Sequence, residues 1–409
     1  MARRRRDDVI VAAMRWAIPV IAFGNFVIGT GVMVVGGMLP PLADGLDVTI
    51  PVAAQLITGM AIAMALGAPV LGMLTARFDR RRLLTIALLV YAAGHLACAL
   101  APGYATLLGL RILLAASPAI FTPQASAALA LIIPPEKRGR AVAFALLGWA
   151  LASVLGMPIG AYVGAVFGWR AGFGLVAVLA LVAAIGVRLV LPAGLSISMS
   201  GRSIWGELLR WPALQLAIAV TAIQAAGQFT VMAFFVPALQ SFLGAEPALV
   251  SLLLVLFGVM GFAGALVSAR FMDSAGPVPV FHASLALIAL GMLLWPLGNG
   301  SLAWVVVSMS LWGLGAFATN NAQQARLIAA APPLASVTIA LNTSGMYIGQ
   351  AIGTPLGAAL LSAPPQAADY AWLALYGLPI IALAFAVSFR ARQLGERRAT
   401  PRRPSQESP

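Results

Sequence analysis

The stretch Gly72-Met-Leu-Thr-Ala-Arg-Phe-Asp-Arg-Arg-Arg82 separates two long apolar runs, Pro51–Ala76 and Leu83–Ala101. Each run is long enough to cross a bilayer as a helix, which takes roughly 20 apolar residues. Four arginines lie within the six positions 77–82, and such loops belong on the cytoplasmic side of a membrane. The stretch is therefore predicted to be a tight cytoplasmic loop between two transmembrane helices. A weaker copy, Gly264-Ala-Leu-Val-Ser-Ala-Arg-Phe-Met-Asp273, indicates that the chain has two related halves.

The composition is that of a polytopic membrane protein. The 409 residues are 61% hydrophobic and 9% charged, whereas soluble domains carry about 25% charged residues. A net charge of +13 is often a sign of nucleic-acid binding. Here the basic residues lie in short segments between apolar runs, so we expect the lipid bilayer and no nucleic acid as a partner. Cys98 is the only cysteine, which excludes a disulfide framework and a cysteine metal cluster.

Apolar runs between Gly, Pro and charged breaks predict about twelve spanning helices. The first run, 16–40, is too long for the apolar region of a signal peptide, so it is predicted to remain as a helix. The predicted spans are 16–41, 52–75, 83–101, 105–133, 139–166, 170–191, 213–242, 248–269, 278–298, 302–331, 335–363 and 369–389.

The distribution of positive charge predicts the orientation of these helices. With an even number of spans, both termini lie on one side of the membrane. All basic residues except Arg111 and Arg170 then fall on that side or at helix ends facing it. This positive-inside pattern predicts that both termini are cytoplasmic.

The spans and charges divide the chain into five segments. We predict a cytoplasmic basic segment at 1–15, a six-helix bundle at 16–191, a second at 213–389 and a disordered cytoplasmic tail at 390–409. Between the bundles lies a linker at 192–212, in which residues 204–211 have the mixed composition of a helix lying on the membrane surface.

Three landmarks recur at a nearly constant separation along the chain. Gly72 matches Gly264, Pro134-Pro135 matches Pro332-Pro333, and the Gly-x-Pro-x-Gly motif of 156–160 matches that of 353–357. An ordered set of matches indicates a duplicated six-helix unit. Many secondary transporters are built this way, with the substrate site between the repeats.

From about Trp16 to Arg390 the residues resemble the major facilitator superfamily, and within it the bacterial drug/proton antiporter-like group that includes arabinose- and nucleoside-efflux permeases. The first loop resembles the family motif Gly-x-x-x-Asp-Arg-x-Gly-Arg-Arg, and the matching positions are Gly72, Arg77, Arg80 and Arg81. Ala76 stands at the usual Asp and Asp79 at the second Gly. The resemblance implies that this loop helps to hold the two halves together on the cytoplasmic side, chiefly in the outward-open state. We hypothesise that Asp79 takes over the contact of the missing carboxylate with the other half.

Two further motifs carry implied gating or coupling roles. Leu110-Arg111 resembles the intramembrane Arg motif of the fourth helix, and Gly156, Pro158 and Gly160 resemble the antiporter Gly-Pro motif of the fifth. A charge at the depth of Arg111 costs roughly 2.5–3.5 kcal/mol unless it is paired or hydrated. We favour a buried cation that serves gating, coupling or anion binding over an arginine that snorkels to the headgroups.

The first helix departs from the resemblance at a position that concerns proton coupling. Relatives often carry a buried Glu where this chain has Val32, and all twelve acidic residues fall at loops, helix ends or tails. His95 and His282 titrate near neutral pH when unperturbed, but their places near helix ends favour structural roles.

Polar residues at mid-helix depth are the candidate substrate-binding residues. Gln224 and Gln228 share one face of the seventh helix, and Tyr347 has the amphipathic ring suited to a partly wet pocket. The resemblance implies that helices one, four, seven and ten line the central cavity. The candidates are Asn25, Gln124, Gln224, Gln228, Asn320, Asn321 and Tyr347. The alternative is that these amides only hold helices together, at about 0.6 kcal/mol each.

We therefore predict an all-α transporter of twelve helices in two pseudo-symmetric bundles, in the bacterial inner membrane and monomeric. It would export a small neutral, cationic or amphipathic molecule by alternating access, with the proton gradient as energy source and no cofactor, although Arg111 leaves an anionic substrate open. No nucleophile–base pair or metal-ligand spacing indicates an enzyme or a metal site. The alternatives are an uncoupled facilitator of the same fold and a membrane sensor or scaffold that does not transport.

Overall fold

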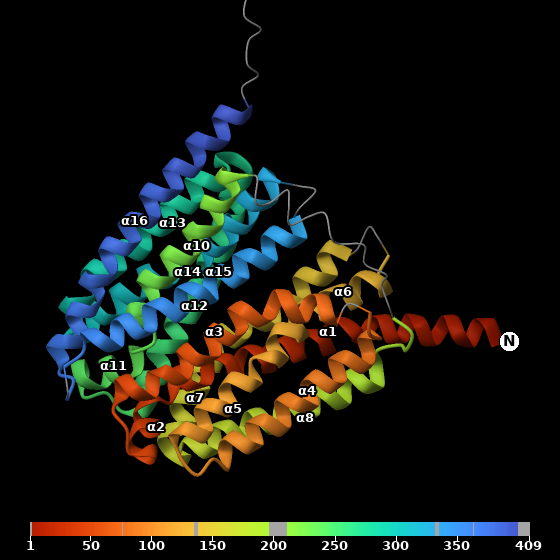
Figure 1. The fold of residues 1–409 in the computed structure, drawn as a ribbon, viewed down its shortest axis with the longest axis horizontal. Helices are drawn as coiled ribbons and strands as arrows, with labels where there is room; N and C mark the ends of the chain where they lie inside the picture. The colour runs from red at the N-terminus through yellow and green to blue at the C-terminus, as the bar shows by residue number, and fades with distance from the viewer. Residues whose placement is uncertain are drawn as a thin grey trace, which may run out of the picture.

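The computed structural model describes residues 2–75, 77–134, 138–195, 211–331, 335–362 and 364–399, and all regular structure in these ranges is helical (Figure 1). The helices of the first half are α1 (Ala2–Gly37), α2 (Leu39–Leu46), α3 (Ile50–Leu74), α4 (Arg80–Ala99), α5 (Tyr104–Leu114), α6 (Ala116–Ile132), α7 (Arg138–Phe167) and α8 (Trp169–Val190). Those of the second half are α10 (Pro212–Met232), α11 (Phe235–Leu243), α12 (Pro247–Ala275), α13 (Pro277–Leu294), η2 (Trp295–Gly298), α14 (Leu302–Ala330), α15 (Ala335–Leu360) and α16 (Ala367–Ala399).

These helices make up the twelve membrane-spanning segments that the sequence predicts, and we call each such segment a rod because some of them contain two consecutive helices. Eleven spans within the described residues are long and apolar enough to cross a membrane. The twelfth rod is α15, which is as long but more polar, because it carries Asn342, Thr343, Ser344 and Gln350. The polytopic all-α fold is thereby confirmed.

Four rods are interrupted where the apolar runs predict one continuous helix, and a proline lies at or just after each interruption. The breaks fall between α1 and α2, α5 and α6, α10 and α11, and α13 and η2. Proline has no N–H, so it leaves the carbonyl four residues earlier without its helical partner. Pro41, Pro118, Pro237 and Pro296 each stand three to four residues after, or directly at, the corresponding break.

The ends of two helices differ from the predicted spans. Helix α12 continues to Ala275 and α16 to Ala399, beyond the predicted ends at 269 and 389. Both extensions contain charged residues, and Arg and Glu are good helix formers although they do not belong in an apolar span. Residues 390–399, predicted as disordered tail, are thus helical, while the predicted surface helix of the linker lies mostly outside the described residues.

Each half contains a pair of helices packed through glycine. A methyl group built on Gly156 would lie 3.0 Å from Thr30 Cα, and one on Gly160 would lie 2.9 Å from the Val34 oxygen, so α7 packs directly on the backbone of α1. Gly353 and Gly357 place α15 in the same way on α10. Small residues allow such close approach of helices in lipid. The repeated Gly-x-Pro-x-Gly motif is therefore a packing surface in both halves.

The two halves meet along two helix pairs and at one end of the molecule. Helix α3 packs against α15 and α7 against α12, while α2 and α11 touch at one end. Figure 1 shows the ribbons of the halves diverging from that end toward the end where α4 begins and α16 finishes. Ser251 of α12 donates a hydrogen bond across the halves to the Pro158 oxygen of α7 (3.1 Å).

Candidate functional site

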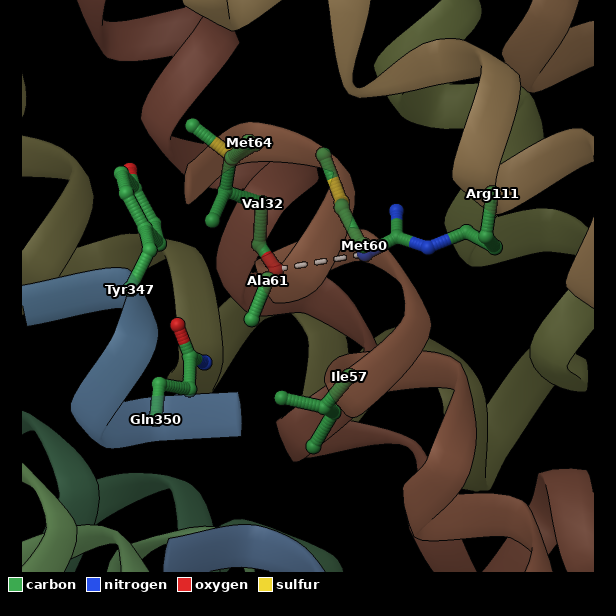
Figure 2. A pocket seen from close by; sticks show the side chains of 8 residues that line it. All are labelled: Val32, Ile57, Met60, Ala61, Met64, Arg111, Tyr347 and Gln350. Carbon is green, nitrogen blue, oxygen red and sulfur yellow. Dashed lines mark hydrogen bonds between the residues drawn. The ribbon is translucent and has the colours of Figure 1, made fainter. Parts of the chain in front are cut away.

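A narrow gap lies between the halves where α1, α3 and α5 face α15 (Figure 2). It is too tight to admit a water molecule in this arrangement. We call it the interface gap, and its lining residues are Val32, Ile57, Met60, Ala61, Met64, Arg111, Tyr347 and Gln350. The first half contributes mainly apolar groups and one guanidinium, and the second half contributes a phenol and an amide. Tyr347, predicted as a substrate-binding residue, is buried here.

Arg111 is buried inside the bundle and does not reach toward headgroups. Its side chain has 0% exposure. One terminal nitrogen donates to the Gly31 oxygen at 2.8 Å and the other to the Val32 oxygen at 3.4 Å, and the second bond is drawn in Figure 2. Its Nε has no hydrogen-bond partner. At the position where relatives often carry a buried acid, this chain offers Arg111 the Val32 main-chain carbonyl in place of a carboxylate.

Two further residues of α4 meet the same turn of α1. The Tyr91 hydroxyl donates to the main-chain oxygen of Ile28 at 2.9 Å. His95 Nδ1 lies 2.9 Å from the main-chain carbonyl oxygen of Tyr91. The two rings pack edge to face with centroids 4.2 Å apart. Tyr91 was not among the predicted residues, although it stands one helical turn before His95 and hence on the same face. The structure therefore places His95 beside Arg111 in a polar cluster, which the order of the helices alone could not show.

Neutral side chains of the second half form two hydrogen-bonded groups of three residues each, which we together call the amide network. Gln228 donates to Gln224, and Trp312 Nε1 donates to Gln228 Oε1 at 3.0 Å. Thr221 donates to Asn342 at 2.5 Å, and Asn342 in turn donates to Asn320 at 3.3 Å. The network comprises Thr221, Gln224, Gln228, Trp312, Asn320 and Asn342.

Three members of the amide network were predicted and three were missed. Gln224, Gln228 and Asn320 were candidates, and Asn342 carries the same signal of an amide at mid-helix depth. Thr221 lies three residues before Gln224 on the same face of α10. All donors and acceptors of the network are uncharged, so it can hydrogen-bond hydroxyl, carbonyl and amide groups without a counterion.

The remaining predicted binding residues lie apart from the amide network. Asn25 donates to the Ala145 oxygen and accepts from Thr122, both at 3.1 Å, which ties α1 to α7 and α6. Gln124 donates to Thr75 at 3.3 Å, near the end of α3. Asn321 is half-buried beside Asn320. In this structure the hydrogen bonds of Asn25 and Gln124 lie within the first half, and their role in substrate binding stays a prediction.

The predicted loop motif closes on its own half. Asp79 accepts from Arg82 N at 3.0 Å as the cap of α4, and its other oxygen accepts from Gly194 N at 2.6 Å and Leu195 N at 2.9 Å. Arg80 N donates back to the Leu195 oxygen at 2.9 Å. Asp79 therefore ties the start of α4 to the chain leaving α8, and the hypothesised contact with the second half is absent among its described partners.

The other residues of the motif differ in their surroundings. Arg80 is buried and donates to the Thr75 oxygen at 3.3 Å. Arg81 is half-buried and Arg77 is exposed. Gly72 belongs to the last turn of α3. No group of three His, Cys, Asp or Glu side chains that could hold a metal ion occurs in the described part of the chain.

Comparison with known proteins gives matches along both halves. The sequence profile of the Major Facilitator Superfamily matches residues 21–335 and 217–409. The inner membrane transport protein YdhP of Escherichia coli K12 is 29% identical over 371 residues, which cover 90% of this chain and 94% of YdhP. A chloramphenicol resistance protein of Streptomyces lividans is 34% identical over 272 residues, which cover 66% of this chain and 68% of that protein.

Solved structures show the same fold. A bacterial homologue of the human lysosomal transporter Spinster, in an inward-facing and unoccupied conformation, aligns with a TM-score of 0.73 at 17% identity. The alignment covers 97% of this chain and 99% of the homologue. The all-helical fold described above is thus a known architecture.

Proposed function

Because the chain belongs to the major facilitator superfamily, we propose that it exports a small uncharged or amphipathic molecule by alternating access in exchange for protons. The setting we propose is a bacterial inner membrane with both termini cytoplasmic, as the basic residues at the termini and loops favour. The YdhP match, an inner membrane transport protein, supports that location.

The amide network is the observation that carries the proposed substrate class. The amide oxygens of Gln224 and Asn320 each accept one hydrogen bond within the network. Their amide nitrogens have no hydrogen-bond acceptor among the described residues. These N–H groups can donate to a bound molecule. A site built from hydrogen-bonding groups discriminates strongly against analogues that lack the matching polar atoms.

Arg111 narrows the proposed substrate class to molecules without a permanent positive charge. Its positive charge stands at the interface gap without an ion-pair partner among the described residues. An uncompensated charge in a poorly screened interior repels a like charge over several ångströms. A permanently cationic molecule is therefore a poorer candidate than a neutral one. The name of the Streptomyces lividans relative suggests chloramphenicol, an uncharged molecule with hydroxyl and amide groups, as a first probe.

Flux in proteoliposomes tests the proposal with radiolabelled chloramphenicol as the probe. Antiport predicts that an imposed pH gradient drives accumulation and that dissipating the gradient abolishes it. Equilibration that ignores the gradient would instead identify an uncoupled facilitator. This alternative is favoured by one observation, the absence of a mid-membrane carboxylate in the sequence. Absence of flux for chloramphenicol and a panel of neutral compounds would contradict transport.

A matched pair of variants tests the amide network. Gln228→Leu removes the acceptor of Trp312 and the donor to Gln224, so we expect it to raise KM at least fivefold. Gln393→Leu makes the same chemical change at an exposed position of α16 and is expected to leave KM unchanged. Equal effects of the two variants would contradict the assignment.

A further inference from the structure

His95 has a protonation state that its hydrogen bond defines. Its Nδ1 lies 2.9 Å from the main-chain carbonyl oxygen of Tyr91. A carbonyl oxygen can only accept a hydrogen bond. The proton of the neutral imidazole is therefore on Nδ1, and Nε2 presents a lone pair. The side chain has 0% exposure, and Nε2 has no hydrogen-bond partner.

The unpartnered Nε2 and the guanidinium of Arg111 converge on Gly31. A methyl group built on Gly31 would lie 2.8 Å from His95 Nε2 and 2.4 Å from the Tyr91 hydroxyl. Gly31 of α1 therefore packs directly against the Nε2 edge of the imidazole. Arg111 already donates to the Gly31 oxygen at 2.8 Å. A proton on Nε2 would thus create a second cationic donor at an oxygen that Arg111 occupies.

The surroundings of His95 contain no described group that could balance two positive charges. From its own helix come Tyr91 and Cys98, from α5 comes Arg111, and from α8 comes the apolar ring of Phe173, whose centroid lies 6.0 Å from that of His95. Like charges this close repel strongly in a poorly screened interior. An imidazolium at His95 would therefore weaken the binding of the guanidinium at Gly31.

We propose that His95 is the proton-carrying residue of this transporter and that its protonation moves Arg111 from the Gly31 oxygen toward the interface gap. This rests on the proton antiport proposed above. A proton from the aqueous phase binds the Nε2 lone pair, and the new N–H donates to the Gly31 oxygen. No covalent bond between heavy atoms forms or breaks, and release of the proton restores the present arrangement.

The displaced guanidinium has acceptors on the far side of the interface gap. Tyr347 and Gln350 of α15 line the same gap as Arg111 and carry oxygen atoms, and in Figure 2 Val32 and Ala61 are seen between them and the guanidinium. A bond from Arg111 to either residue would join the two halves. Loss of its bonds to Gly31 and Val32 would at the same time release α5 from α1. Proton uptake at a residue of the first half would thereby alter the contact between the halves.

NMR of the full-length protein in nanodiscs tests the proposal without a substrate or a gradient. The chain has two histidines, so labelling with ¹⁵N-histidine gives two imidazoles, and His282→Gln assigns them. We expect His95 to be the Nδ1–H tautomer at pH 8 and to gain a proton on Nε2 as the pH falls to 4. A His95 that carries its neutral proton on Nε2, or that stays neutral throughout, would overturn the proposal.

Two variants of Arg111 test the coupling itself. Arg111→Gln removes the competing charge and should raise the His95 titration midpoint by about one pH unit or more, which is at least tenfold in proton affinity. Arg111→Lys keeps the charge and should leave the midpoint near that of the wild type. A midpoint unchanged by Arg111→Gln would contradict the coupling. If Arg111→Gln does not fold, the wild-type tautomer and titration still decide. Flux without gradient dependence would refute antiport separately.

Discussion

Gly258 offers a direct test of the contact between the halves. A methyl group on this glycine of α12 would lie 2.5 Å from Val154 Cα and 3.1 Å from the Ser153 oxygen of α7, while ordinary contact begins at 3.4 Å. Gly258→Ala therefore requires the two helices to separate by about 0.9 Å, the difference between 3.4 and 2.5 Å. Overpacking of this kind costs about 1–3 kcal/mol.

The cost falls on whichever conformation contains this contact. If only the present arrangement contains it, Gly258→Ala shifts the population toward the alternative by about 5- to 150-fold. Double electron–electron resonance between spin labels at Asp44→Cys and Ser241→Cys, in a Cys98→Ala background, measures the distance between α2 and α11 at the end where the halves meet. We expect a longer-distance component to grow.

The matched control is Gly174→Ala in α8, where a methyl group would meet nothing within 4 Å. It should leave the distance distribution unchanged. The reasoning would be refuted if Gly258→Ala gave the wild-type distribution, because the contact between α7 and α12 would then cost the same in both conformations.

Three smaller changes follow from individual bonds. Asp79→Ala removes the cap of α4 and the hydrogen bond to Gly194, so the free energy of unfolding, measured by thermal unfolding, should fall by about 0.5–2 kcal/mol. Arg77→Ala, at an exposed position, is the control. Equal unfolding midpoints for the two variants would contradict the role given to Asp79. Ser251→Ala removes one bond across the halves, worth about 0.6 kcal/mol, so the label distances should shift in population by less than threefold. Trp312→Phe leaves the buried Gln228 oxygen without its donor and should destabilise the protein by about 1–3 kcal/mol, which an unchanged unfolding midpoint would disprove.

The sequence predicted the rods and their duplication because apolar length and Gly-Pro spacing are local properties. It could not predict which face of a rod a polar residue occupies in the packed bundle. Asn25 and Gln228 are both amides at mid-helix depth, yet Asn25 holds α1 to α7 whereas Gln228 belongs to the amide network. Only the packing of neighbouring helices decides between these roles.

The cluster around Gly31 shows the same limit. His95 and Arg111 lie on different helices, and no spacing along the chain indicates that both lie against one glycine of a third helix. Asp79 differs for another reason. Its predicted partner followed from the family motif, but the motif here has Ala76 in place of the acid, and the carboxylate at 79 is positioned to cap α4.

The central claim is that the two halves rock about a pathway that opens to one side at a time. Spin-label distances measured at both ends test it most directly, with one pair at Asp44 and Ser241 and another at Arg82 and Ser274, all exposed or near the surface. Alternating access predicts that conditions which lengthen one distance shorten the other. Two distances that stay fixed, or that lengthen together, would contradict it.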